Sequence, residues 1–217
     1  CMAPSGLDVC RLRLGDILVK RGSMDAQCAG AEGREWIQTV GGTYFTHSAL
    51  YVGDLKIAEA AGSVKCDPLD PCDRSEEVRE TGLSGTQFWS GECVTDWAVL
   101  RPEASDDQKQ TAIGYALAKA QEEGVVFDIK AARDNDMRFY CAKFVWRTYQ
   151  EAGVEVEAES QLCRLDLGYF VTPDELYFGS PAVQELSPTR TDRLKAIICS
   201  PGHLAVVDSR GKRAGFD

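Results

Sequence analysis

The sequence predicts an α+β fold formed by a single domain over residues 1–217, with an antiparallel sheet packed on helices. Two hydrophobic patterns predict it. Short apolar runs with strand-like alternation dominate the first half of the chain, and apolar residues at helical spacing dominate the second half. No internal repeat and no linker divides the sequence, so one domain is the simplest arrangement.

The first half of the chain supplies most of the predicted strands. Residues 12–19 form a strand entered through a Gly-Asp turn, and residues 48–52 and 55–60 form a hairpin across Gly53-Asp54. The segment that follows, 61–93, is rich in Asp, Pro, Gly, Ser and Cys. This composition predicts a long cysteine-containing insertion with little regular structure.

The second half opens with a helix over residues 105–123, which Ser105 can cap and Gly124 ends. A second amphipathic helix is expected from Met137 to Ala152, with Asp134 or Asp136 as its cap. The remaining expected elements are a strand at 94–101, a helix that starts at Thr172-Pro173, and closing strands at 194–199 and 204–207.

Charge and hydropathy exclude several classes of partner. The formal net charge is −10, and no run of Lys and Arg offers the basic surface that nucleic-acid phosphates require. The same charge disfavours docking on anionic lipid through electrostatics alone. No stretch of about eighteen apolar residues is present, so no transmembrane segment is expected.

The nine cysteines indicate disulfides rather than a metal site, because the sequence has no Cys-x-x-Cys pair and only two histidines. Cys66 and Cys72 bracket a Pro-containing stretch typical of a turn closed by a disulfide. Disulfides favour a periplasmic, cell-envelope or secreted location. The alternative is that several of these cysteines are buried thiols. No metal and no organic cofactor is expected.

Cys1 is open to two interpretations. The stretch from Cys1 to Gly6 resembles the mature start of a bacterial lipoprotein, which predicts a lipid anchor on Cys1; the alternative is that the sequence was cut there for other reasons. With Cys141 set aside, eight cysteines could form four bridges. A lipidated Cys1 would leave seven, so the two hypotheses compete, and the disulfide connectivity stays open.

Cys141 stands in a different context from the other cysteines. It lies at the start of an amphipathic helix, where unpaired N–H groups and the helix dipole favour a thiolate and can hold an oxyanion. A cysteine nucleophile needs a base, and His47 precedes an apolar strand run, whereas His203 lies in a turn. These features favour Cys141 as nucleophile and His47 as base; the alternative is that Cys141 is an ordinary core cysteine.

Four short motifs occur in an order that resembles a known family: Leu14-Gly15-Asp16-Ile17-Leu18, Thr46-His47-Ser48-Ala49-Leu50-Tyr51-Val52, Ile57-Ala58-Glu59-Ala60 and Phe139-Tyr140-Cys141-Ala142-Lys143-Phe144-Val145. The order is similar to that of the circularly permuted, NlpC-type papain-like cysteine hydrolases, in particular YiiX-like proteins. The resemblance implies a permuted papain-like fold with Cys141 as nucleophile, His47 as base and Glu59 as the group that orients His47. Ala142-Lys143 departs from the Ser-Glu that often follows the family's cysteine.

The predicted hairpin supports the role of Glu59 independently, because counting from Gly53-Asp54 places position 47 opposite a residue near 59 or 60. The alternative for Glu59 is a solvated strand residue. Tyr140 and Asp16 are candidates for the substrate or oxyanion site, although Tyr140 could simply pack.

The resemblance implies a cysteine peptidase or amidase that acts on a peptide or muropeptide of the bacterial cell wall (peptidoglycan), and a secreted antibacterial effector is a related hypothesis. One alternative is a lipid amidase or acyltransferase-like enzyme. Another is a non-catalytic, disulfide-stapled binding domain, which predicts Cys141 in a disulfide or far from His47.

Overall fold

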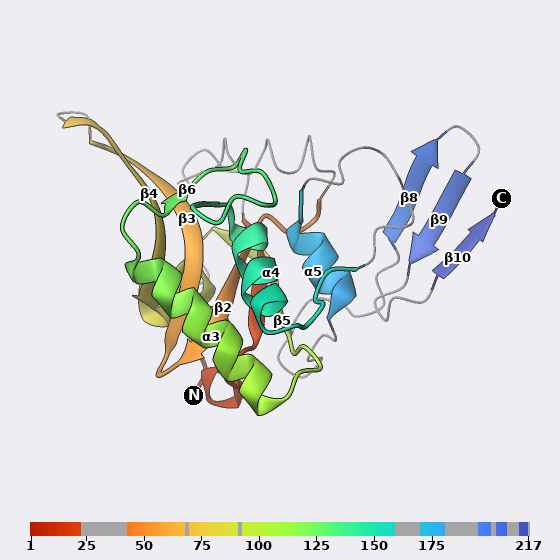
Figure 1. Cartoon of the computed structure of the whole chain (residues 1–217), viewed down its shortest axis with the longest axis horizontal. Coiled ribbons are helices and arrows are strands. Elements are labelled where there is room, and N and C mark those ends of the chain that lie inside the picture. The colour runs from red at the N-terminus through yellow and green to blue at the C-terminus, as the bar shows by residue number, and fades with distance from the viewer. Residues whose placement is uncertain are drawn as a thin grey trace.

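The structure is a computed structural model (Figure 1) that describes residues 1–22, 43–67, 70–90, 93–158, 170–180, 195–200, 203–207 and 213–216. Side chains are described for residues 1–22, 43–62, 77–86, 88–90, 93–158 and 170–180.

Five antiparallel strands form the main sheet, in the order β4-β3-β2-β1-β5. The strands are β1 (Ile17–Gly22), β2 (His47–Gly53), β3 (Lys56–Asp67), β4 (Asp70–Gly82) and β5 (Val94–Leu100). The antiparallel sheet and its helices confirm the predicted α+β class. The boundary of β1 differs from the prediction, because Leu14 and Gly15 form the turn that precedes it.

The helices are the short α2 (Gln87–Ser90), α3 (Asp106–Gln121), α4 (Cys141–Glu151) and α5 (Pro173–Gly179), and two 3-10 turns cover Val9–Arg11 and Leu83–Gly85. Ser105 caps α3 by accepting a hydrogen bond from the Gln108 amide, as predicted, and Thr172 caps α5 in the same way.

The start of α4 lies four residues later than predicted. Tyr140 is its N-cap and Cys141 its first residue, so neither Asp134 nor Asp136 caps it. The reason is that Arg138 and Phe139 form a short strand, β7 (Arg138–Phe139), which pairs with β6 (Val126–Phe127). Asp136 instead accepts two hydrogen bonds from Arg147, at 2.9 and 3.0 Å.

Apolar side chains cover both faces of the sheet. On one face, strand residues such as Ile17, Val19 and Leu50 form a core with buried residues of α3, α4 and α5. On the other face, Leu18 and Ala49 pack with the N-terminal segment and Phe88 of α2. Figure 1 shows α3 and α4 lying side by side across the first face. This packing fixes α4, and hence its first residue, relative to β2 and β3.

The segment after residue 60 is more regular than its composition predicts. The strands β3 and β4 form a long antiparallel hairpin, in which Glu59 pairs with Arg79 and Asp67 with Asp70. Polar and charged residues are compatible with a two-stranded ribbon when they face solvent. The predicted irregular insertion is therefore wrong for residues 61–67 and 70–82, whose backbone is β-strand.

A separate three-stranded sheet lies near the C-terminus, with β8 (Lys195–Ser200), β9 (His203–Val207) and β10 (Arg213–Phe216) in the order β10-β9-β8. It contains the two predicted closing strands and one more. Figure 1 draws it at the opposite end of the molecule from the tip of the β3–β4 hairpin. Whether it belongs to the same domain as the main sheet stays a prediction.

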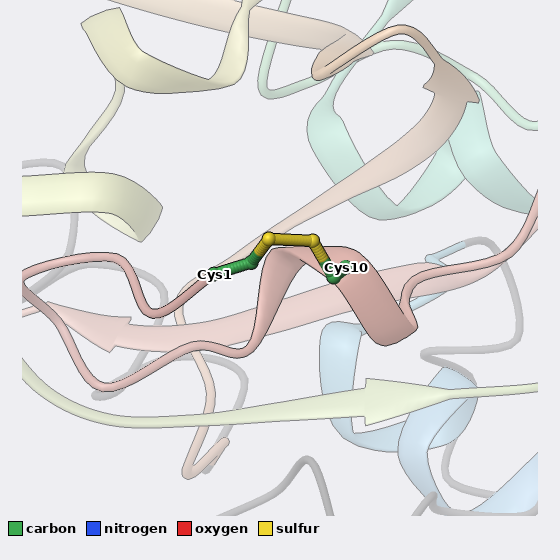
Figure 2. The surroundings of a disulfide bond; sticks show 2 residues. All are labelled: Cys1 and Cys10. Carbon is green, nitrogen blue, oxygen red and sulfur yellow. A yellow bond between two sulfur atoms is a disulfide. The ribbon is translucent and has the colours of Figure 1, made fainter.

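Cys1 and Cys10 form a disulfide that ties the first residue to the Val9–Arg11 turn, with their Cα atoms 5.5 Å apart (Figure 2). One sulfur cannot hold both this bond and a thioether to lipid, so the disulfide contradicts the expected lipid anchor on Cys1. Cys93 is also in a disulfide bond. The expected bridge between Cys66 and Cys72 falls on side chains outside the described residues.

None of the helices within the described ranges is both long enough and apolar enough to cross a membrane.

Candidate active site

Cys141 is the first residue of α4, and its side chain is 4% exposed. Among the cysteines whose side chains the structure describes, it is the free thiol. Burial raises the pKa of this thiol, but a hydrogen bond and the charge of His47 outweigh that effect, together with the backbone amides of Ser48 and Ala142. The pKa of Cys141 therefore lies below its ordinary value, which favours the nucleophilic thiolate.

His47 is the first residue of β2 and connects Cys141 to Glu59. Its Nε2 atom lies 2.8 Å from Oε2 of Glu59, and its ring also hydrogen-bonds to Cys141. Because Glu59 takes Nε2, we assign Nδ1 to the sulfur. Burial lowers the pKa of His47, whereas hydrogen bonds and charges from Cys141 and Glu59 raise it, and the net pKa lies above its ordinary value. A thiolate–imidazolium pair is the state that these opposite shifts favour.

The strands β2 and β3 stop pairing near the Cys141 sulfur. The ladder between β2 and β3 begins at the turn and ends, within these described strands, at the pair Leu50 and Ala58. Beyond that pair, β3 continues only with β4. The amide of Ser48 is thereby left without a partner on β3, and it donates to Cys141 instead. The departure of β3 from β2 thus makes a place for the N-terminus of α4.

Glu59 is buried, at 4% exposure, and both of its carboxylate oxygens have partners. His47 contacts Oε2, while Arg79 donates to Oε1 from Nε at 3.1 Å and from a terminal nitrogen at 2.8 Å. Burial raises the pKa of Glu59, but the hydrogen bond and charge of His47 and the charge of Arg79 lower it to about 2. Glu59 is therefore an ionised acceptor that holds the His47 ring in place.

The register of the hairpin differs from the predicted one by one position. Its turn is formed by Asp54 and Leu55, which both have positive φ, rather than by Gly53-Asp54. The pair Leu50 and Ala58 would place residue 61 directly across from His47. Glu59 therefore reaches His47 diagonally along the same face, which is within the range of a long side chain.

The two further candidates, Tyr140 and Asp16, have hydrogen-bond partners other than Cys141. The Tyr140 hydroxyl accepts a hydrogen bond from the amide of Val171 at 2.8 Å, and its ring packs against Phe170, so the side chain has packing contacts; its role at the oxyanion stays a prediction. The carbonyl of Gly15, next to Asp16, accepts a hydrogen bond from the Tyr149 hydroxyl. Asp16 therefore lies beside the C-terminal half of α4. Two turns of helix separate Tyr149 from Cys141.

Asp16 has a structural environment of its own. Its carboxylate accepts hydrogen bonds from Arg101 at 2.8 and 2.7 Å and from the amide of Arg13 at 2.8 Å. Asp16 thus ties the turn before β1 to the residue that follows β5. The placement of Asp16 in a substrate or oxyanion site does not agree with this position.

Sequence reasoning gave no role to two charged residues near the site. Arg79 lay in the segment expected to be irregular, and only a strand pattern there would have placed it across from Glu59. Lys143, which departs from the family's pattern, is fully buried and donates to the carbonyls of Ala132, Asn135 and Arg138. It thereby fastens the loop that leads into α4. The rival base His203 begins β9, and its side chain is outside the described part of the chain.

A metal ion bound by the protein would need several donor side chains that converge on one point. Among the side chains that the structure describes, no group of three or more His, Cys, Asp or Glu residues is arranged in this way. Cys141, His47 and Glu59 instead follow one another in a chain of contacts, with the imidazole ring in the middle.

Comparisons with known proteins give one similar structure. No family model matches the chain, and no curated protein matches it. The chain is similar to the crystal structure of metalloprotein yiiX from Escherichia coli O157:H7, at 17% identity and a TM-score of 0.45, over 76% of this chain and 91% of that one. That protein is of the YiiX type that the four sequence motifs resemble. At this level the similarity says nothing about the chemistry of the present chain.

Proposed function

We propose that this protein is a cysteine hydrolase that cleaves an amide bond through an acyl-enzyme. The observation that supports the proposal is the chain of contacts from the Cys141 sulfur through the His47 ring to the Glu59 carboxylate. A free thiol with a lowered pKa, a ring with a raised pKa and an ionised orienting group are the parts that thiol hydrolysis requires.

In the proposed reaction, the Cys141 thiolate attacks the carbonyl carbon, and the carbonyl π electrons move to its oxygen. The backbone amides in the first turn of α4, including that of Ala142, and the Ser48 amide are near the charge that develops. The oxyanion collapses, the C–N bond breaks, and the His47 imidazolium gives its proton to the leaving amine. Water then attacks the thioester while His47 takes a proton from it, and release of the acid regenerates Cys141.

The proposed substrate is a cell-wall stem peptide, and the proposed location is the cell envelope, the periplasm or the exterior. The substrate rests on the motif order in the sequence, which resembles the NlpC-type, permuted papain-like hydrolases. The location is supported by the Cys1–Cys10 bridge and by the bonded state of Cys93, because disulfides persist in oxidising compartments.

The test of this proposal is to incubate the protein with purified wall fragments and, in parallel, with diacyl lipids, and to measure new amines and free acids. Cys141→Ala is the matched control. We expect new amino groups from the wall fragments that are absent with Cys141→Ala. Products from the lipids alone would favour the lipid amidase instead, and no product from either substrate, with an intact and reactive Cys141, would count against hydrolysis of both classes.

A further inference from the structure

Arg79 binds the side of Glu59 that faces away from His47. The two residues are cross-strand partners on β4 and β3. Arg79 directs two nitrogens at Oε1 of Glu59, so that Oε2 stays available for His47. A third nitrogen of Arg79 donates to Glu77 at 2.9 Å. Glu77 is 47% exposed and Arg79 34% exposed, so the guanidinium lies between a buried carboxylate and a solvated one.

The proposed reaction changes the charge of His47 but leaves Glu59 buried throughout. While His47 is an imidazolium, Glu59 has a cationic partner. After His47 gives its proton to the leaving group, that partner is neutral, and a buried carboxylate without a counter-ion favours protonation. Arg79 does not titrate in this range, because a guanidinium keeps its proton at every pH that enzymes use. It is therefore a permanent counter-ion for Glu59.

We propose that Arg79 is a positioning residue that keeps Glu59 ionised and directed at His47 in both charge states of the imidazole. The inference rests on the proposed function, and it assigns part of the catalytic apparatus to the β3–β4 hairpin. Arg79 acts through Glu59 and touches neither the nucleophile nor the base. A protonated Glu59 would be a poorer partner for the imidazolium, and the thiolate would be lost at a higher pH.

Among the described side chains, the other charged groups around Glu59 and His47 make different contacts. Cys141, from α4, faces His47 rather than Glu59. Lys20, the cross-strand neighbour of His47 on β1, places its ammonium 5.1 Å from the centre of the Phe88 ring. Glu77 contacts Arg79 and not Glu59. Among the described side chains, the largest charges that act on Glu59 are therefore those of His47 and Arg79.

The experiment is the pH dependence of Cys141 alkylation by iodoacetamide, followed on the Cys141 peptide by mass spectrometry. Four proteins form a cycle: wild type, Arg79→Met, Glu59→Gln, and the double variant. An opposite charge close to a carboxylate lowers its pKa by about 1–3 units, so we expect the acid limb in Arg79→Met to move up by about one pH unit or more. In the Glu59→Gln background, Arg79→Met should change nothing further. Arg79→Lys should recover part of the shift.

Lys56→Met is the matched control, because it breaks an exposed ion pair with Glu80 on the same two strands. Its profile should coincide with that of the wild type, and circular dichroism should show each variant folded. An Arg79→Met profile that matches the wild type would overturn the proposal. An equally large shift of the acid limb between Glu59→Gln and the double variant would overturn it as well. Neither outcome would touch the proposed function, which fails instead if wild-type Cys141 itself alkylates like an ordinary thiol.

Discussion

Two buried carboxylates, Glu59 and Asp16, each pair with an arginine, but they use their oxygens differently. Arg101 takes both oxygens of Asp16, and the Arg13 amide takes one of them as well. Arg79 takes one oxygen of Glu59 and leaves the other to His47. The Asp16–Arg101 pair uses both carboxylate oxygens and joins the turn before β1 to the residue after β5. The Glu59–Arg79 pair leaves one carboxylate oxygen to His47, a residue that titrates, and this contact would connect the ion pair to the proposed reaction.

The largest expected effect is on activity, which should fall when Glu59 is substituted but not when Asp16 is. Glu59→Gln should lower kcat/KM by about 10²–10⁴-fold, because the amide cannot stabilise an imidazolium. Asp16→Asn should leave kcat/KM unchanged per folded molecule. The measurement is hydrolysis of whichever substrate the wall-fragment assay identifies, with the folded fraction determined separately. Equal losses in the two variants would remove the distinction between the pairs.

Stability should depend strongly on the Asp16–Arg101 pair. Asp16→Asn leaves the Arg101 charge partly buried and without its carboxylate, and breaking such a pair costs about 3–5 kcal/mol. The expected result is a fall of that size in the free energy of unfolding measured with urea. Lys56→Met, on an exposed ion pair, should change it by less than about 1 kcal/mol. A stable Asp16→Asn protein would show that the turn before β1 does not depend on this pair.

Acid should weaken the fold through Glu59. Its pKa is about 2 in the folded protein and near 4.5 ordinarily, so the folded state binds the proton less readily. The stabilisation is complete well above pH 4.5 and is lost as the pH falls toward 2, with a size of about 3 kcal/mol. Urea unfolding between pH 6 and 3 should therefore show a shallower pH dependence in Glu59→Gln than in the wild type. Parallel curves would contradict the low pKa of Glu59.

A buried lysine whose hydrogen bonds go to backbone carbonyls offers the smallest test. Lys143 is held by three backbone carbonyls of the loop before α4, and Lys143→Met leaves those carbonyls without their donor. A fall of about 1–3 kcal/mol in the free energy of unfolding is expected. An increase in stability would indicate that desolvation of the ammonium outweighs its hydrogen bonds.

The sequence was sufficient to predict the strands around His47, the cap of α3, the start of α5 and the approach of Glu59 to His47. Each of these depends on local chemistry: a turn, a capping serine or threonine, and alternation along a hairpin. The one-position error in register arose because Leu55 adopts a positive φ that its side chain disfavours, which placed the turn one residue later.

The features that sequence reasoning missed depend on pairing between distant or unexpected segments. The start of α4 at Cys141 follows from the pairing of Arg138–Phe139 with β6, which no helical periodicity reveals. Arg79 reaches Glu59 because a polar, cysteine-containing segment folds as a strand. Asp16 lies in a motif that resembles the family's, yet its arginine partner, Arg101, is 85 residues away.

The central claim is that His47 holds Cys141 as a thiolate, and its most direct test is the alkylation rate of Cys141 at pH 6 in wild type and in His47→Ala. The lowered pKa of Cys141 and the raised pKa of His47 predict rapid alkylation in the wild type, and a rate in His47→Ala that falls to that of an ordinary thiol. Equal rates in the two proteins would contradict the claim.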